Sequence, residues 1–233
     1  MADLSLVIPC YNEEKNIKKL FEQISKLENK FNLEVIVVNN GSTDNSSTII
    51  DSEKKIIKNL KFKKIEKNIG FGNGVKEGVK NATSNLICYA HGDLQTDLED
   101  VYKAYNIYKT SNVGKKFIKG SRQKRPLIDL TFTFLMSLIN SILFRKVLYD
   151  IHAQPNLFER SLIKNFDFLP NDMSLDLYMI LNAKINDYKI LRFKVNFLKR
   201  RFGIGSNENL SKKVKYSLHS LFSSLSILFH GRF

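Results

Sequence analysis

One short segment combines the residue types of a divalent-cation site with a position at the end of a predicted strand. The apolar run Leu86–Ala90 is followed at once by residues 91–95, His-Gly-Asp-Leu-Gln. Open α/β sheets bind ligands at the carboxyl ends of their strands, and a Mg²⁺ or Mn²⁺ held by one or two protein groups keeps coordination positions for substrate phosphates. We therefore expect Asp93, Gln95 and His91 to hold a metal that binds a diphosphate. An ordinary polar turn is the alternative, because glycine and aspartate are common turn residues.

Three further polar loops stand at the ends of predicted strands. They are residues 9–14 (Pro-Cys-Tyr-Asn-Glu-Glu), 39–44 (Asn-Asn-Gly-Ser-Thr-Asp) and 68–74 (Asn-Ile-Gly-Phe-Gly-Asn-Gly). Each alone is an unremarkable loop, since turn residues collect between periodic segments. Four of them in this order predict one binding edge.

The elements that would position these loops alternate along the first 110 residues. Strands are expected at Leu4–Pro9, Glu34–Asn39, Lys61–Glu66 and Leu86–Ala90, and helices at Glu13–Lys30, Asn45–Lys58, Gly72–Asn81 and Leu98–Thr110. Continuous apolar runs are typical of strands buried on both faces of a parallel sheet. The pattern predicts an α/β fold, with a Rossmann-like, mostly parallel sheet flanked by helices.

The net charge of +14 is concentrated in the second half of the chain. Residues 1–110 carry 16 Lys and Arg against 15 Asp and Glu, whereas residues 111–233 carry 21 against 8. Such asymmetry indicates an anionic partner, which is a nucleic acid, an acidic membrane surface or a phosphorylated substrate. The basic half shows no nucleic-acid-binding motif or interleaved aromatics, so no nucleic acid is expected.

Two segments of the second half have a membrane-like composition. Residues 130–144 are uncharged and are bracketed by basic residues. Fifteen residues are fewer than the about 20 that a spanning helix needs, so we expect a helix near 127–148 that lies either at a membrane interface or in the protein core. Residues 206–233 place apolar side chains at helical spacing opposite lysines and serines, which predicts an amphipathic C-terminal helix. This helix would dock on a membrane, on its own domain or on a second copy.

Together these motifs resemble the family 2 glycosyltransferases of the nucleotide-diphospho-sugar (GT-A) fold. The likeness is strongest to the branch of polyprenyl-phosphate and dolichyl-phosphate mannose or glucose synthases. It continues through Gly120-Ser121-Arg122, Asp150–Pro155 and Asp172–Asp176, and it ends at residues 200–203. The resemblance implies an inverting, metal-dependent transferase that moves a sugar from a UDP- or GDP-sugar to a polyprenyl phosphate or lipid-linked glycan. It would act in the cytoplasm, at the inner face of the cell membrane.

The resemblance also implies site residues. The nucleotide sugar would be bound by Pro9, Tyr11, Glu13, Asn39, Gly41, Ser42, Asn68, Gly70, Gly72, Arg200 and Arg201. The catalytic residues would be Asp93, Asp176, Asp150 and Arg122, and the divalent cation, Mn²⁺ or Mg²⁺, would be held by Asp93, Gln95 and His91.

The chain departs from the family pattern at three places. Asn39 replaces an acid that contacts the base, and its amide mildly favours uracil over guanine. His91 also replaces an acid, and imidazole suits Mn²⁺ better than Mg²⁺. Residues 152–155 replace a Ser-Gly-Phe-Arg-like run, and the missing arginine weakens the assignment of a lipid phosphate.

The acceptor decides the remaining chemistry. A lipid phosphate is already anionic and needs cations such as Arg122, Lys124 and Arg125. A sugar hydroxyl, as in surface polysaccharide synthesis, must lose a proton to a carboxylate, for which Asp176 is the first candidate and Asp172 the second.

The expected organisation is one GT-A domain over residues 1–205 and the amphipathic helix over 206–233. Residues 1–110 form the nucleotide-sugar-binding half and 111–205 the acceptor half. No secretory signal is recognised at the N-terminus. The alternative to an enzyme is a membrane protein that binds nucleotide sugars without turnover.

Overall fold

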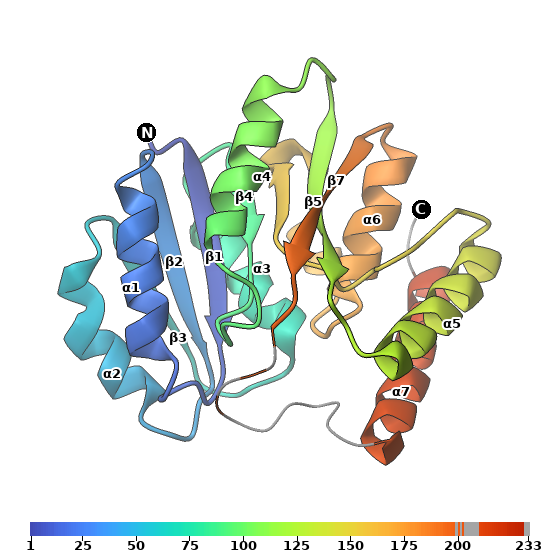
Figure 1. Cartoon of the computed structure of the whole chain (residues 1–233), viewed down its shortest axis with the longest axis horizontal. Helices are drawn as coiled ribbons and strands as arrows, with labels where there is room; N and C mark the ends of the chain where they lie inside the picture. Colours follow the sequence, from blue (N-terminus) through green and yellow to red (C-terminus); the bar gives the residue numbers. More distant parts are fainter. Residues whose placement is uncertain (199, 201, 203–209, 231–233) are drawn as a thin grey trace.

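The computed structural model describes residues 1–198, 200, 202 and 210–230. Its centre is a seven-stranded sheet in the order β3-β2-β1-β4-β6-β5-β7 (Figure 1). All paired strands are parallel except β6, which runs antiparallel to both β4 and β5. The strands are β1 (Leu4–Cys10), β2 (Leu33–Asn40), β3 (Leu60–Ile65), β4 (Leu86–Tyr89), β5 (Lys116–Gln123), β6 (Asn156–Glu159) and β7 (Lys189–Asn196).

Helices cover both faces of the sheet. The helices are α1 (Ile17–Glu28), α2 (Ser46–Glu53), α3 (Phe71–Asn81), α4 (Glu99–Thr110), α5 (Leu127–Phe144), α6 (Leu175–Ile185) and α7 (Leu210–His230). One core cluster joins the sheet to α1, α2 and α4, and a second joins it to α3 and α6 on the opposite face. In Figure 1, α1 and α4 lie in front of the sheet.

The two core clusters explain why the central strands carry continuous apolar runs. Every residue of β1, β2 and β4 is buried, since side chains on alternate sides of a strand enter different cores. The predicted α/β fold with a mostly parallel sheet is confirmed. The four strands expected in the first half match β1–β4 with ends that differ by at most one residue.

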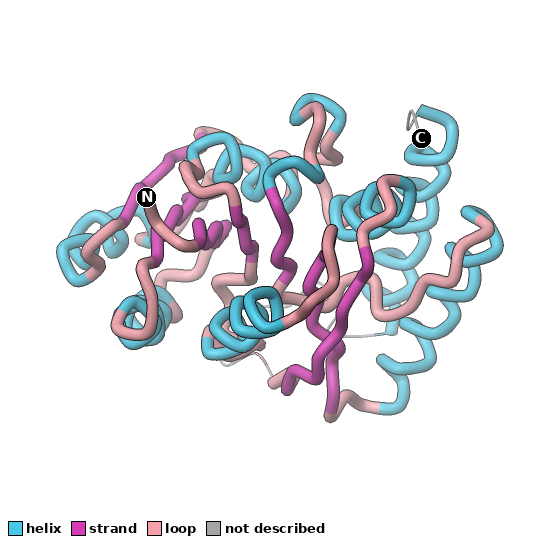
Figure 2. Tube along the Cα trace, turned by 90° about the horizontal axis from the view of Figure 1, so that it is seen from above, coloured by secondary structure: helices cyan, strands magenta, loops and turns pink. Residues whose placement is uncertain are grey.

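Helices α5 and α7 pack against each other beside the sheet, as Figures 1 and 2 show. Of the 18 residues of α5, only Ser137 and Asn140 are buried, so the alternative of a core helix is wrong. The helix is longer than the run of 15 uncharged residues. Among the described residues α5 is the one helix long and apolar enough to cross a bilayer by length and composition, because Leu127 and Ile128 extend it before Asp129.

The C-terminal helix is also confirmed, as α7. Its exposed apolar side chains include Val214, Leu218, Phe222 and Phe229. The side of α7 that faces the domain buries Ser224 and Ile227, and there the hydroxyl of Ser223 donates a hydrogen bond to Oδ2 of Asp172 over 2.6 Å.

Candidate active site

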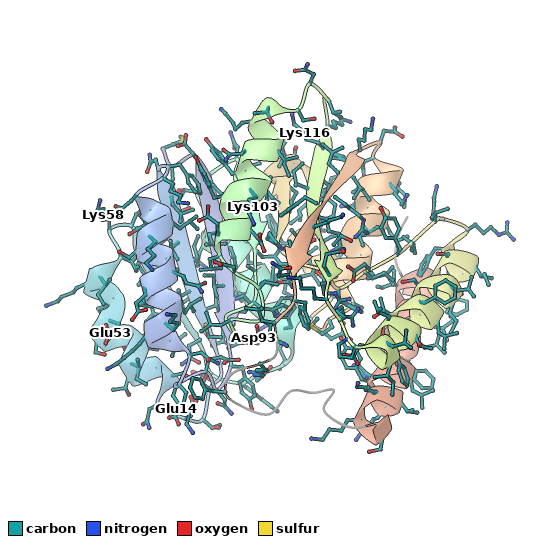
Figure 3. The ribbon with its side chains drawn as sticks, viewed as in Figure 1. Glu14, Glu53, Lys58, Asp93, Lys103 and Lys116 are labelled. Carbon is teal, nitrogen blue, oxygen red and sulfur yellow. The ribbon has the colours of Figure 1, made fainter. Side chains whose placement is uncertain are left out.

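The four polar loops meet at the carboxyl edge of the sheet. β1 lies between β2 and β4 and runs parallel to both, so the chain leaves all three strands at the same edge. Figure 3 shows Asp93 and Glu14 at this lower edge and Lys116 at the opposite edge. The fold therefore places the predicted binding loops at one edge of the sheet.

The first two loops are joined through Asn12. Its backbone N–H donates to Oγ of Ser42 over 3.0 Å, and its side-chain oxygen accepts from the backbone N–H of Thr43 over 2.8 Å. Asn39, predicted to contact a base, is buried, and its Oδ1 accepts from the backbone N–H of Ser42 over 2.9 Å. Tyr11, in the first of these loops, is 44% exposed to solvent.

The third loop contacts the second at Gly41. This residue has a φ of +73°, and a Cβ there would lie 2.4 Å from the backbone N of Asn68, so only glycine fits. Pro9 lies nearby, because a Cβ added to Gly74 would come within 2.8 Å of its Cβ.

Two glycines predicted to bind the nucleotide sugar lie directly against protein backbone. A Cβ on Gly70 would lie 2.3 Å from the carbonyl oxygen of Asn171, and a Cβ on Gly72 would lie 2.2 Å from that of Pro170. The backbone N–H of Asn73 also donates to the carbonyl of Asn171 over 2.8 Å. The loop that leads into α6 therefore packs directly on the glycine-rich loop.

Arg200 connects the first loop to the predicted metal loop. Its guanidinium forms an ion pair with the buried carboxylate of Glu13, and its Nη1 lies 3.9 Å from Oδ2 of Asp93. Burial raises the pKa of Glu13, while hydrogen bonds from Asn16 and Arg200 oppose the rise. A cation thus lies between two carboxylates at the sheet edge. Arg201 lies outside the described residues.

The predicted metal loop, residues 91–95, is held in place on both sides of Asp93. The backbone N–H of Gln95 donates to Oδ1 of Asp93 over 3.1 Å, and the Gln95 amide nitrogen donates to the carbonyl of Leu198 over 3.2 Å. A Cβ on Gly92 would lie 2.8 Å from the sulfur of the buried Cys10. The ring of His91 packs against Phe71, with centroids 4.6 Å apart.

The donor set at this loop fits a cation that is shared with a substrate. Asp93 offers a largely buried carboxylate, and the Gln95 carbonyl oxygen is the amide atom not used in the bond to Leu198. The described residues contain no cluster of three His, Cys, Asp or Glu groups placed to hold a metal. One or two protein ligands completed by phosphates are the usual arrangement for Mg²⁺, and a closed protein cage is not.

In the predicted acceptor half, Arg122 and Asp150 are paired with each other. The Asp150 carboxylate accepts from the backbone N–H and from Nε of Arg122, both over 2.7 Å, and from Nη2 over 2.5 Å. Burial alone would raise the pKa of Asp150, but Arg122 outweighs it and lowers that pKa. Arg125 follows, and its guanidinium donates to Thr133 of α5 over 2.8 Å.

Asp176, the first candidate for a proton acceptor, has no exposed surface. Its Oδ1 accepts from the hydroxyl of Tyr89 over 2.7 Å and from the amide of Asn156 over 3.0 Å. Nδ1 of His152 lies 3.4 Å from its Oδ2. Burial opposes ionisation, yet Lys119 and His152 outweigh it, so the pKa of Asp176 is lowered.

Sequence reasoning missed Lys119. It stands inside an apolar strand and is completely buried, where its ammonium donates to the carbonyl of Ala153 over 2.6 Å and to Asn156 over 2.7 Å. The only sequence signal is a lysine in a strand-like run, which does not distinguish a buried side chain from an exposed one.

A cavity of about 130 Å³ lies between the glycine-rich loop, the start of α6 and α7. Phe71, Asp172 and Tyr216 contribute to its wall. Asp172, the second candidate acid, accepts from the backbone N–H of Ser174 over 3.0 Å and lies 3.4 Å from Nε2 of His219.

Comparison with known proteins adds a family to this geometry. The model of the family described as "Glycosyl transferase family 2" matches residues 5–127. A dolichyl-phosphate beta-glucosyltransferase of Dictyostelium discoideum is 26% identical over 159 residues, which cover 64% of this chain and 47% of that protein. A dodecaprenyl-phosphate galacturonate synthase of Rhizobium johnstonii is 31% identical over 104 residues, covering 42% and 30%. This chain therefore spans half or less of these two relatives.

The fold is shared with a solved glycosyltransferase. Glucosyl-3-phosphoglycerate synthase from Mycobacterium tuberculosis, in complex with Mn²⁺, UDP and glucosyl-3-phosphoglycerate, superimposes with a TM-score of 0.73. The match covers 96% of this chain and 80% of that one at 16% sequence identity. The predicted GT-A arrangement is thereby confirmed as a fold.

Proposed function

Because the chain belongs to glycosyl transferase family 2, we propose that it moves a sugar, with inversion, from a nucleotide-diphospho-sugar to a lipid-linked acceptor. The favoured acceptor is a polyprenyl phosphate, and a lipid-linked glycan is the second. The observation that carries the proposal is Arg200, which connects Glu13 of the predicted nucleoside loop with Asp93 of the predicted metal loop. A diphosphate between these loops would compete with the two carboxylates for the same guanidinium.

The donor side supports this reaction electrostatically. Breaking the bond between sugar and diphosphate leaves negative charge on the diphosphate, and a cation fixed beforehand at that place lowers the barrier. Arg200 supplies such a charge and is held by Glu13, with a second bond from its Nε to the carbonyl of Phe202 over 2.9 Å. A divalent cation at Asp93 and Gln95 would add Lewis-acid stabilisation of the same leaving group.

Two relatives are named for lipid-phosphate acceptors, and the α5–α7 pair supports such an acceptor here. Leu127, Phe134 and Ile142 of α5 are 79%, 65% and 70% exposed, and Phe222 and Phe229 of α7 are 70% and 76% exposed. An apolar surface of this extent marks an interaction site. Lys124, Arg145, Lys146, Lys212 and Lys215 lie next to it in the sequence.

The connections of α5 favour a helix lying on a membrane over one that crosses it. α5 is about 27 Å long at 1.5 Å per residue. Asp150, six residues after its end, hydrogen-bonds Arg122, five residues before its start. Both ends of the helix thus return to the same place on the domain. We propose peripheral attachment to the cytoplasmic face, with basic residues near anionic lipid headgroups.

The donor half of the proposal is tested by transfer assays with UDP- and GDP-sugars and a short-chain polyprenyl phosphate. We expect transfer that EDTA abolishes and Mn²⁺ restores, and that Asp93→Ala removes. Asp51→Ala, which loses a surface ion pair with Lys64, is the matched control and should keep full activity. Full activity after EDTA treatment and in Asp93→Ala would refute the metal-dependent mechanism.

The nucleotide and the role of His91 are tested with the same protein. UDP-sugars should raise the melting temperature more than GDP-sugars, because the amide of Asn39 favours uracil over guanine. A ligand at 100 times its Kd stabilises the protein by about 2.7 kcal/mol. His91→Asp should move the metal preference from Mn²⁺ toward Mg²⁺. Nucleotide binding without transfer to any acceptor would favour the non-catalytic alternative.

The membrane half is tested by sedimentation with phosphatidylglycerol-containing vesicles. The wild type should bind, and binding should weaken at high salt because headgroup attraction is screened. Phe134→Ser and Phe222→Ser should each reduce the bound fraction several-fold. Ile56→Ser, at an exposed apolar residue of the α2 region, should not. Equal binding by all variants would show that the α5–α7 surface is not the attachment site.

A further inference from the structure

We infer that His152 is the side chain that contacts the reacting oxygen of the acceptor phosphate, and that the buried Asp176 acts only through it by positioning its ring. The inference rests on the proposed function and deepens it, because it assigns the acceptor to a named residue. Sequence reasoning gave the phosphate contact to cations such as Arg122, Lys124 and Arg125, and made Asp176 the proton acceptor for a sugar hydroxyl.

The burial of Asp176 prevents direct contact with a substrate. The residue has no exposed surface, and its Oδ1 is occupied by Tyr89 and Asn156. These two bonds fix the carboxylate in one orientation. Its remaining oxygen, Oδ2, has no hydrogen-bond partner and is buried, so it must be satisfied by a neighbour within reach.

His152 is that neighbour. Its Nδ1 is also buried without a hydrogen-bond partner and lies 3.4 Å from Oδ2 of Asp176. A small movement of the ring would satisfy both atoms at once and remove two desolvation penalties. A proton on Nδ1 facing a carboxylate leaves Nε2 as the second functional atom of the ring. The side chain is 23% exposed, whereas Asp176 is not, so only the histidine offers an accessible group.

The position of His152 places it beside the cavity under α7. Its ring meets the ring of Tyr216 edge to face at 6.2 Å between centroids, and Tyr216 lines the cavity together with Phe71. Phe71 in turn packs against His91 of the predicted metal loop. Two residues that line this cavity, Tyr216 and Phe71, therefore contact His152 and the predicted metal loop, respectively.

The surroundings of His152 leave Nε2 as the atom that can meet an anion. Asp176 from α6 faces Nδ1 across 3.4 Å, and Tyr216 from α7 packs against the ring. Lys119 from β5 and Tyr89 from β4 act on the carboxylate of Asp176.

The reaction step then needs no proton transfer. An acceptor phosphate oxygen, hydrogen-bonded by Nε2–H of His152, forms a bond to the anomeric carbon. The bond from that carbon to the donor diphosphate breaks, and its electron pair leaves with the diphosphate. His152 neither takes up nor releases a proton in this step, and its hydrogen bond orients the incoming phosphate.

The first test separates acceptor effects from donor effects in steady-state kinetics. We expect His152→Ala to raise KM for a short-chain polyprenyl phosphate about tenfold or more, and His152→Gln, which keeps an N–H donor without the imidazole ring, to raise it less. KM for the nucleotide sugar should not change in either. An equal change in both KM values, or none in the acceptor KM, would overturn the inference.

Asp176→Asn distinguishes positioning from general support of the fold. If Asp176 acts only through His152, the double variant Asp176→Asn/His152→Ala should have the same acceptor KM as His152→Ala alone. Additive effects would contradict this, since independent sites add and coupled sites do not. Circular dichroism and melting curves of each variant show whether it folds.

A second readout does not depend on turnover. The ring signal of His152 in the NMR spectrum, assigned by its loss in His152→Gln, should shift on addition of a short prenyl phosphate and not of the corresponding prenyl alcohol. Absence of transfer to any polyprenyl phosphate would refute the proposed acceptor, while a shift would still support the phosphate contact. Binding of the prenyl phosphate without a shift would refute the inference even in an active enzyme.

Discussion

Replacing the buried Lys119 by methionine should change how the stability of the protein depends on pH. The ammonium of Lys119 has no exposed surface and is held by the carbonyl of Ala153 and by Asn156. Burial lowers its pKa from 10.5 to about 7, with the nearby carboxylate of Asp176 opposing the shift. The folded state therefore releases this proton more than three pH units before the unfolded chain does.

The sign follows from proton counting. Between pH 7 and 10.5 the unfolded chain keeps the lysine proton that the folded protein loses, so the free energy of unfolding rises with pH in this window. With a folded pKa of about 7, the rise from pH 7 to pH 9 amounts to about 2 kcal/mol. Below pH 7 both states hold the proton and the lysine contributes no slope.

The assay is urea denaturation at pH 7, 8 and 9 of the wild type, Lys119→Met and the control Lys194→Met, which changes an exposed lysine of β7. The unfolding free energy of the wild type should gain about 2 kcal/mol over Lys119→Met between pH 7 and 9. Titrating groups that do not interact with Lys119 cancel in this difference. Parallel pH profiles for the wild type and Lys119→Met would refute the buried, proton-losing lysine.

Two further predictions concern stability. Gly72→Ala should destabilise the protein by about 1–3 kcal/mol, although alanine usually favours a helix, because the new Cβ would lie 2.2 Å from the carbonyl oxygen of Pro170. The control Gly114→Ala, which has open space around it, should leave the melting temperature unchanged. Equal effects of the two substitutions would be evidence against the packed loop. Burial disfavours the charge of Glu34, but hydrogen bonds, first that of Lys61, outweigh burial and lower the pKa of Glu34 to about 2. The stabilisation by this carboxylate is therefore present above pH 4.5 and is lost as the pH falls toward 2. Glu34→Gln should reduce the loss of stability between pH 4.5 and 2 in denaturation curves, and an unchanged loss would show that the carboxylate is not its source.

The first half of the fold was predictable because its signals are local. Leu86–Ala90 reads as a strand from its own residues, and β4 follows it to within one residue. The loops at the strand ends then converge because parallel strands end at one edge. The same reasoning assigned no strand to β5, β6 or β7, where lysines, arginines and polar residues interrupt the apolar runs.

The functional contacts depend on distant partners and were less accessible. Glu13 meets Arg200 across 187 residues, and no local pattern specifies that pair. Asp176 was recognised as an acid of interest, but its burial is set by Tyr89 and Asn156 from other strands. For the same reason composition left α5 undecided between core and surface, since exposure depends on what packs against a helix.

The hydrogen bond between Ser223 and Asp172 has a thermodynamic consequence. α7 carries exposed apolar residues on one side, and through Ser223 it holds the loop that rests on Gly70 and Gly72. Any surface that favours this placement of α7 must therefore favour this placement of the loop. Linkage is reciprocal: an acceptor that orders the loop would tighten the attachment of the helix by the same factor. Binding of an acceptor at the site and binding of α7 to the surface would then depend on the same conformational equilibrium.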